Sequence, residues 1–291
     1  MNPLARDFLG GLDRVEFARQ CDLEPDAHQA AFLRSTARNK VVVTSRQLGK
    51  STMSALEGAA DAWYDVVHPE ARAVLGPKAH ALVLITSPSQ RQSDETFAKL
   101  QGHLGRKIAG VVEAHVRAET VLTTWERKPG TAARVLSSEA VEEWKVRSLT
   151  LTNGARVVSL PGAPETVRGF SSVTRVIVDE AGFAPPGLLG ALRPMMLVSR
   201  GSLSMLSTPN GKRGEFYDAC SGGGEDWERY TLDWTKNPRI SREDVERERR
   251  LLPAWLFAQE YECTFTSLLG AVFHESDIEG ALVDDERTMN V

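Results

Sequence analysis

The sequence has few cysteines and histidines, and their spacing fits neither a disulfide framework nor a zinc site. Its 291 residues hold three cysteines with no C-x-x-C pair and six histidines with no H-E-x-x-H spacing. This usage argues against a disulfide-rich secreted domain and against a zinc cluster, and it fits a reducing compartment. We therefore expect no protein-held transition metal. The cysteines are Cys21, Cys220 and Cys263.

Long apolar runs and an excess of basic residues are also missing. No apolar stretch approaches the length of a membrane span, and the N-terminal segment lacks the apolar centre of a signal peptide. We therefore expect a cytoplasmic protein with no membrane partner. The formal net charge is -4, from 35 Lys and Arg against 39 Asp and Glu. Any contact with nucleic acid must then come from a local basic patch.

Short apolar strands alternate with helical segments along most of the chain. The composition is 42% hydrophobic and 25% charged, and the length allows one large domain with a small appendage. The alternation predicts an α/β fold with a mainly parallel sheet and helices on both faces. Asn153-Gly154 favours a type I′ hairpin turn. Expected helices are 4–37 (broken near Pro25), 51–67, 93–104 and 241–265 (broken at Pro253); expected strands are 41–44, 80–86, 147–161 (a hairpin), 174–180, 201–209 and 229–234.

The stretch TSRQLGKST, residues 44–52, follows an apolar strand and precedes an expected helix. It is similar to the phosphate-binding pattern G-x-x-x-x-G-K-[ST], except that Thr44 replaces the first glycine. In such a loop, backbone amides bind phosphate oxygens, Lys50 reaches the β- and γ-phosphates, and the Ser51 hydroxyl ligates Mg²⁺. A surface turn with a chance G-K-S would read the same. The expected nucleotide contacts are Ser45, Arg46, Gln47, Leu48, Gly49, Lys50, Ser51 and Thr52.

An acidic pair in VIVDEAGF favours the nucleotide interpretation of the loop. Asp179 and Glu180 end an apolar, β-branched run. In a P-loop sheet such an Asp179 holds Mg²⁺ through water, and the adjacent Glu180 is placed to orient or deprotonate an attacking water. A solvated turn also carries such pairs, but both motifs in this order predict ATP hydrolysis. A kinase must exclude water and has no use for Glu180.

A third signal is the strand end in LSTPNGKRGEFYD. Ser207, Thr208 and Pro209 are polar or turn-forming residues at the end of an apolar run. Beside the acidic strand, they could contact the γ-phosphate or its water and report its loss. A plain strand-to-turn exit favours the same residues, so both interpretations stay open.

Together these motifs resemble the ATPase domain of the large terminase subunit, the DNA-packaging motor of tailed bacteriophages. That family's loop has the form S-R-Q-x-G-K-[ST], matched by residues 45–51, and its acidic pair precedes a small residue and an aromatic. Its coupling motif of S-T-P type, with later glycines and a phenylalanine, also matches. The matching residues after each motif are Ala181 and Phe183, then Gly211, Gly214 and Phe216. The resemblance covers residues 20–275 approximately and implies a P-loop NTPase fold of the ASCE/RecA-like type.

The resemblance also implies roles for three residues outside the core motifs. Arg46, inside the loop, becomes a catalytic phosphate-side cation, with an ordinary surface arginine as the alternative. Gln29, upstream of the loop, becomes the adenine-reading residue, since its amide can both donate and accept. Arg168 becomes the arginine finger supplied to a neighbouring subunit. The rival arginines are Arg175, Arg193 and Arg200.

The implied cofactors are ATP and Mg²⁺, and the implied partners are those of a packaging motor. They are double-stranded DNA, other copies of the chain in a ring, the portal protein and the small terminase subunit. The implied location is the host cytoplasm, transiently at the portal vertex of the procapsid. A possible DNA-facing set around the hairpin comprises Lys128, Arg134, Lys145 and Arg147.

The sequence predicts three parts, namely an ATPase core with an N-terminal helical segment (1–235), a helical lid or linker (236–270) and an acidic tail (271–291). In the family the tail leads to a nuclease domain, which we do not find in this sequence, so we expect no DNA cleavage. One alternative function is a helicase-like ATPase, for which the stretch 180–291 is short. Another is a P-loop assembly protein without turnover, against which the intact Lys50 and Glu180 argue.

Overall fold

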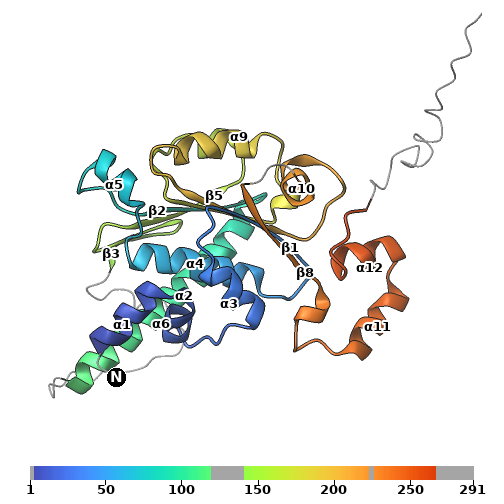
Figure 1. The fold of residues 1–291 in the computed structure, drawn as a ribbon, viewed down its shortest axis with the longest axis horizontal. Helices are drawn as coiled ribbons and strands as arrows, with labels where there is room; N and C mark the ends of the chain where they lie inside the picture. Colours follow the sequence, from blue (N-terminus) through green and yellow to red (C-terminus); the bar gives the residue numbers. More distant parts are fainter. Residues whose placement is uncertain (1–2, 119–140, 223–225, 267–291) are drawn as a thin grey trace, which may run out of the picture.

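Eight strands form a single sheet at the centre of the computed structural model, in the order β3-β4-β5-β2-β6-β7-β1-β8 (Figure 1). The structure describes residues 3–118, 141–222 and 226–266. From β5 to β8 every neighbouring pair is parallel, whereas β4 is antiparallel to both β3 and β5. The strands are β1 (Asn39–Thr44), β2 (Leu82–Ser87), β3 (Val141–Lys145), β4 (Ser148–Leu151), β5 (Arg156–Pro161), β6 (Arg175–Asp179), β7 (Ser202–Ser207) and β8 (Trp227–Leu232).

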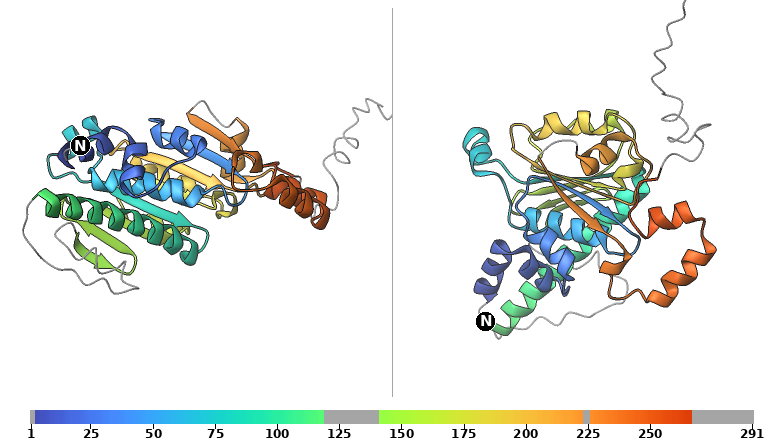
Figure 2. Two further views of the ribbon diagram at one scale, coloured as in Figure 1. Left: turned by 90° about the horizontal axis from the view of Figure 1, so that it is seen from below. Right: turned by 45° about the vertical axis from the view of Figure 1, so that its right-hand side comes forward.

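Helices cover both faces of the sheet and build two hydrophobic cores. One core packs α2, α3, α4 and α6 on one face, and the other packs α8, α9 and α10 on the opposite face (Figures 1 and 2). None of the helices among the described residues is long and apolar enough to cross a membrane. The helices are α1 (Pro3–Leu12), α2 (Arg14–Gln20), α3 (Ala27–Arg34), α4 (Lys50–Trp63), α5 (Pro69–Leu75), α6 (Gln90–Ala118), α8 (Pro164–Val167), α9 (Leu188–Leu192), α10 (Gly214–Ser221), α11 (Arg242–Leu251) and α12 (Ala254–Glu260), with short 3₁₀ turns η1 (Ala181–Phe183), η2 (Arg193–Met196) and η3 (Trp234–Lys236).

The apolar strands are buried on both faces, which explains why they read as continuous runs. In β1, Val42 points into the core beneath α4, while Val41 and Val43 point into the core beneath α10. Alternation of side chains between the two faces produces this division. The structure therefore confirms the predicted α/β fold with a mainly parallel sheet and helices on both faces.

The hairpin between β4 and β5 forms where predicted, but its turn is not type I′. That turn needs positive φ at both central residues, whereas Gly154 has φ 91° and Asn153 does not have a positive φ. The amide of Gly154 donates to the Leu151 carbonyl at 2.9 Å, as in a type I turn closed by a left-handed glycine. Asn153 is held in this conformation because its Nδ2 donates to the carbonyls of Ala62 and Trp63 at the end of α4.

The C-terminal helices α11 and α12 flank Pro253, as the sequence predicts. Figures 1 and 2 place the pair at one end of the sheet, beside β1 and β8. The predicted division into core, lid and tail stays a prediction, and the tail 271–291 lies outside the described residues. Helix α5 and strand β3 were not predicted, and the N-terminal helical segment is three helices.

A network of buried charges joins α4 to the sheet beneath it. Glu57 of α4 is completely buried and contacts Lys40 of β1 at 2.8 Å and Arg175 of β6 at 3.0 Å. Ser204 of β7 donates to the other oxygen of Glu57 at 2.8 Å. One turn further along α4, Asp61 pairs with Arg175 and with Arg14 of α2, the latter at 2.6 Å. One helix is thereby bonded to β1, β6 and β7 at once.

The charges around Glu57 decide its ionisation. Burial alone raises the pKa of a carboxyl group, but the attraction of Arg175, Lys40 and Arg14 outweighs burial and lowers the pKa of Glu57 to about 2. A carboxylate with a depressed pKa stabilises the fold at every pH above its unfolded pKa of 4.5. That stabilisation is lost as the pH falls from about 4.5 towards 2.

We predict that Glu57→Gln lowers the free energy of unfolding by about 3–5 kcal/mol at pH 7, because Lys40 and Arg175 keep buried charges without their carboxylate. Urea unfolding from pH 7 to pH 3 measures this difference, which should shrink below about pH 4.5. The control is Glu262→Gln, which removes an exposed partner of Arg249 and should change stability by about 1 kcal/mol or less. Equal losses in the two variants would contradict the network's role.

Candidate functional site

The loop of residues 45–49 connects the end of β1 to the start of α4, with Lys50 as the first helical residue. Gln47 and Gly49 both have left-handed backbone conformations, with φ of 63° and 74°. Gly49 is required for a second reason, since a Cβ there would lie 2.7 Å from Nε2 of Gln29. The loop therefore leads into the amino end of a 14-residue helix, where free amides favour an anion.

Residues far along the chain hold this loop in place. The amide of Ser45 donates to the Leu232 carbonyl at the end of β8 at 2.8 Å. The buried Asn237 donates through Nδ2 to the Gln47 carbonyl, also at 2.8 Å. The amide of Arg46 donates to the Glu260 carbonyl of α12 at 3.2 Å. Sequence reasoning missed Asn237 and Glu260, and no local motif marks either of them.

The Arg46 side chain is 71% exposed and pairs with the buried carboxylate of Glu260. The hydrogen bond from this carboxylate, followed by its charge, raises the pKa of Arg46. In the structure the guanidinium therefore faces α12. Its predicted role as a phosphate-side cation stays a prediction and would require the guanidinium to leave Glu260.

Lys50 and the acidic pair meet at the carboxyl edge of the sheet. The Lys50 ammonium contacts Oε1 of Glu180 and lies 3.7 Å from Oδ1 of Asp179. The Lys50 side chain is 16% exposed, Asp179 is 6% exposed and Glu180 is 26% exposed. These residues lie 129 and more positions apart in sequence. The fold brings them together because β6 is separated from β1 by β7 alone.

Asp179 and Glu180 are held by further contacts. Thr96 of α6 donates to Oδ2 of Asp179 at 2.8 Å, and the Glu180 amide donates to Oδ1 at 3.0 Å. Glu180 has φ 55° and ψ 40°, a left-handed conformation that is uncommon for residues other than glycine. Backbone strain of this kind concentrates at functional sites. It turns the Glu180 side chain towards Lys50 and away from the path of β6.

The predicted coupling residues lie next to Glu180. Ser207, the last residue of β7, donates to Oε2 of Glu180 at 3.4 Å. Gly182 follows closely, and a Cβ there would lie 3.0 Å from both Oγ of Ser207 and the Thr208 carbonyl. Thr208 is buried, and Pro209 follows it into the turn. The S-T-P strand end is therefore in contact with the acidic pair, while its role in coupling stays a prediction.

The residues present fit a Mg²⁺–nucleotide. Mg²⁺ in such sites takes one or two protein oxygens and fills its shell with phosphates and waters. Ser51 at the start of α4 and Asp179 at the end of β6 offer a hydroxyl and a carboxylate. Among the described residues, no group of three or more His, Cys, Asp and Glu is arranged to hold a metal by itself. Thr52, the other hydroxyl of the motif, lies next to Ser51 in the first turn and is half-buried.

Gln29 lies against the loop, on the side opposite α12. Its Nε2 donates to the Leu48 carbonyl at 3.3 Å, and its Oε1 accepts the Asp26 amide at 3.0 Å in a capping box at the start of α3. Both ends of the amide are therefore used within the protein. Reading an adenine edge would require Gln29 to exchange these partners, so that role stays a prediction.

The four candidate finger arginines have different surroundings. Arg168 follows α8 on the surface and has no ion pair or hydrogen bond with other residues in the described ranges. Arg175 is buried in the network beneath α4 and is not free to reach a neighbouring molecule. Arg200 pairs with Glu70, while Arg193 is exposed. Arg168 and Arg193 are the better placed of the four.

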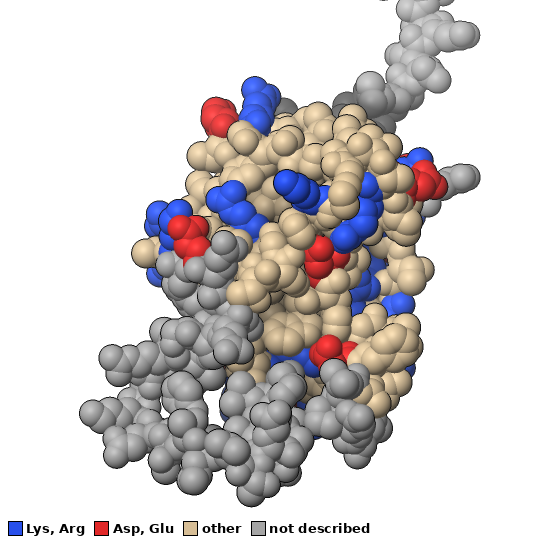
Figure 3. Space-filling model, turned by 90° about the vertical axis from the view of Figure 1, so that its left-hand side faces the viewer, with Lys and Arg blue, Asp and Glu red and all other residues tan. Residues whose placement is uncertain are grey.

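The possible DNA-facing set is only partly visible. Lys128 and Arg134 lie outside the described residues. Lys145 pairs with Glu143 at 2.9 Å, and Arg147 lies 3.3 Å from Asp94. Figure 3 shows one face of the molecule, on which Lys and Arg side chains stand in separate groups between neutral surface and acidic side chains. The coloured part of that face carries no continuous basic stripe.

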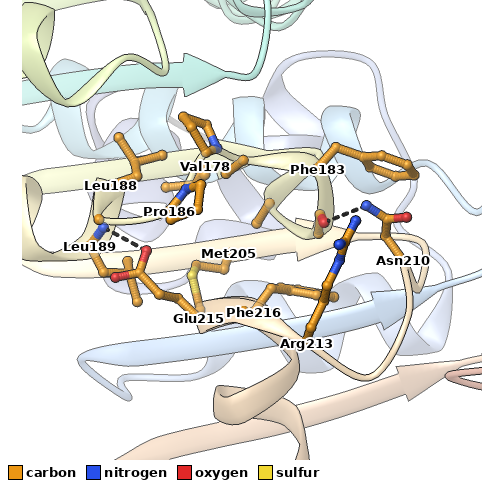
Figure 4. Close-up of a pocket in the computed structure, with 16 residues that line it drawn as sticks. Val178, Phe183, Pro186, Leu188, Leu189, Met205, Asn210, Arg213, Glu215 and Phe216 are labelled. Atoms are coloured by element: carbon orange, nitrogen blue, oxygen red, sulfur yellow. Dashed lines mark hydrogen bonds between the residues drawn. The ribbon is translucent and has the colours of Figure 1, made fainter. Parts of the chain in front are cut away.

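A pocket of about 520 Å³ lies beside η1, between the starts of α9 and α10 (Figure 4). Its walls are mainly apolar, and Arg213 and Asn210 stand at one side of it. Asn210 donates to the Gly182 carbonyl at 2.9 Å, and Glu215 accepts the Leu189 amide at 3.0 Å. The pocket adjoins the acidic pair but is not lined by the phosphate-binding loop.

No protein-family model matches the sequence, and no curated protein matches it significantly. Among solved structures, the chain is similar to the large terminase ATPase domain of Thermus phage P74-26, with 22% identity and a TM-score of 0.61 over 86% of this chain and 98% of that one. The large terminase of a thermophilic bacteriophage in complex with ATP-gamma-S gives 12% identity and 0.54 over 83% and 53%. The HK97 bacteriophage large terminase gives 15% and 0.50 over 89% and 47%.

These comparisons establish the fold. The chain has the architecture of phage large terminase ATPase domains, as the motifs predicted. It spans about half the length of the latter two large terminases. Identities this low carry the fold and not the activity, so the activity has to be argued from the site.

We predict that Gln29→Ala weakens ATP binding and reduces the preference for ATP over GTP. Lost hydrogen bonds to a base edge should weaken ATP binding by roughly 1–3 kcal/mol. Titration of the parent and the variant with fluorescent ATP and GTP analogues measures both quantities. Loss of the capping box alone would weaken both nucleotides equally. An unchanged ratio of the two affinities would leave Gln29 a purely structural residue.

Proposed function

We propose that this chain is the ATP-hydrolysing motor module that translocates double-stranded viral DNA into a procapsid. The observation that carries the proposal is the meeting of Lys50 with Asp179 and Glu180 at the carboxyl edge of a parallel sheet. A lysine at the start of a helix beside two strand-end carboxylates fits phosphate binding and hydrolysis. The fold shared with phage large terminase ATPase domains favours DNA packaging as the purpose of that hydrolysis.

In the proposed reaction the loop amides and Lys50 bind the phosphates of ATP. Ser51 and Asp179 would hold Mg²⁺, Asp179 through water, and the ion would neutralise charge on the β- and γ-phosphates. Glu180 would accept a proton from a water whose oxygen bonds to the γ-phosphorus. The bond from that phosphorus to the bridging oxygen breaks, and ADP and phosphate leave.

The contact between Lys50 and Glu180 describes the state before ATP arrives. Each charge neutralises the other, so Glu180 is a weak base while the contact lasts. An entering γ-phosphate would compete for Lys50 and free the Glu180 carboxylate for the water. Ser207, which reaches Glu180 from the end of β7, would then register phosphate loss through Thr208 and Pro209.

The proposed partners are those of a ring-shaped motor. Copies of the chain would surround double-stranded DNA and dock on the portal protein, with the small terminase subunit delivering the DNA. The work would take place in the host cytoplasm, at the portal vertex of the procapsid. Arg168 would supply its guanidinium to the nucleotide of the neighbouring copy. Its exposure and its lack of a partner among the described residues support that assignment.

We predict that Glu180→Ala keeps nucleotide binding but loses ATP hydrolysis by about 10²–10⁴-fold, as expected for removal of a general base. Steady-state phosphate release and fluorescent-nucleotide binding measure the two properties separately. Glu24→Ala, which removes an exposed carboxylate paired with Arg19, is the control and should retain parental turnover. Near-parental hydrolysis by Glu180→Ala would remove it from the mechanism.

We also predict that the isolated chain is a slow ATPase whose specific activity rises with its concentration. A finger acting in trans is missing from a lone subunit, and arginine fingers contribute about 10³–10⁵ in rate. Arg168→Ala should abolish the rise while ATP affinity stays close to parental. Arg193→Ala, the other exposed arginine, should keep the rise. If Arg193→Ala abolishes it instead, Arg193 is the finger.

Mixing Arg168→Ala with Glu180→Ala supplies a check on the trans arrangement. Neither variant should work alone, because one lacks the finger and the other lacks the base. In a mixed ring, some sites keep Glu180 and receive Arg168 from a neighbouring copy. Part of the activity should therefore return on mixing. No recovery at any ratio would count against a finger shared between subunits.

A further inference from the structure

The end of β2 carries a buried hydroxyl that the proposed mechanism does not use. Ser87 is the last residue of β2 and is completely buried. Its Oγ has no hydrogen-bond partner among the described residues. Buried polar side chains are almost always hydrogen-bonded, and an exception calls for an explanation such as a bound water or ligand.

The strand register places Ser87 beside Asp179. β2 and β6 are parallel neighbours, and Thr86 pairs with Val178, so the next positions along the two strands are Ser87 and Asp179. Side chains alternate along a strand. Ile85 belongs to the core beneath α4 and α6, and so does Ile177 of β6. Ser87 and Asp179, two positions further on, share that face.

The neighbouring hydroxyls on α6 are already engaged. Thr96 donates to Oδ2 of Asp179 at 2.8 Å, and Ser93 donates to the Leu160 carbonyl at 2.7 Å. Both are buried like Ser87. Of these three hydroxyls around the end of β2, Ser87 is the one that the described protein groups leave unpaired. It is also the one that follows directly from a strand adjacent to Asp179.

We propose that Ser87 is a positioning residue whose hydroxyl binds a water in the hydration shell of the Mg²⁺–nucleotide, beside Asp179. This rests on the proposed function. A serine hydroxyl can donate one hydrogen bond and accept two, so it can hold such a water in either orientation. Protein groups behind the direct ligands of a metal fix the orientation of the shell and tune its affinity. Ser87 and Ser207 would flank the acidic strand from its two neighbours, β2 and β7.

The test compares ADP binding with Mg²⁺ and with EDTA, which separates the metal shell from the phosphate loop. Ser87→Ala should lose about 10-fold of the affinity gained from Mg²⁺, within the range for second-shell partners of metals. Its ADP affinity in EDTA should equal that of the parent. Ser87→Thr keeps the hydroxyl and should restore most of the gain. Ser87→Cys keeps the size but bonds weakly, and should behave like Ser87→Ala.

The matched control is Thr86→Val. Thr86 is also buried and has no partner for its hydroxyl among the described residues, but it lies on the opposite face of the same strand. Valine keeps its shape, so Thr86→Val should retain the full Mg²⁺-dependent gain. A parental gain in both Ser87→Ala and Ser87→Cys, or an equal loss in Thr86→Val, would overturn the role of Ser87. A parent that does not bind ADP would instead overturn the proposed function itself.

Discussion

The interaction on which the structure depends is the buried pairing of Glu57 with Lys40 and Arg175. Glu57 lies seven residues, or two turns, beyond Lys50 on α4. Its partners lie on β1 and β6, and Ser204 adds β7. These are the three strands whose carboxyl ends carry the loop, the acidic pair and the S-T-P turn. Fixing α4 over them fixes the distance between the lysine and the acids that meet it.

The loop is held from two further directions, and this shapes what nucleotide binding can do. Gln29 of α3 supports the Leu48 carbonyl, while Asn237 and Glu260 bind Gln47 and Arg46 from the C-terminal segment. A phosphate that drew Arg46 away from Glu260 would loosen α12 from the core. The pairing of Lys50 with Glu180 responds to the same phosphate from the other side. Binding at one site could therefore be felt both at the acidic strand and at the C-terminal helices.

The sequence was informative where chemistry is local. Lys50 and Glu180 could be identified because each belongs to a short motif at the junction of a strand with its next element. Glu260 could not be identified, because its partner Arg46 lies 214 positions away and nothing in the surrounding helix distinguishes it from a solvated acid. The hairpin was located correctly, but its turn type was wrong because contact with the end of α4 overrides the local preference of Asn153-Gly154. Tertiary contacts decided what local patterns left open.

The central claim is that Lys50, with Asp179 and Glu180, makes a site that binds and hydrolyses ATP. The most direct measurement is phosphate release from ATP by the parent and by Lys50→Ala, at several protein concentrations, with and without duplex DNA. The parent should release phosphate at a rate that depends on Mg²⁺, and Lys50→Ala should fall to background while remaining folded. If the two chains hydrolyse ATP at the same rate, or the folded parent does not hydrolyse it under any of these conditions, the claim is contradicted.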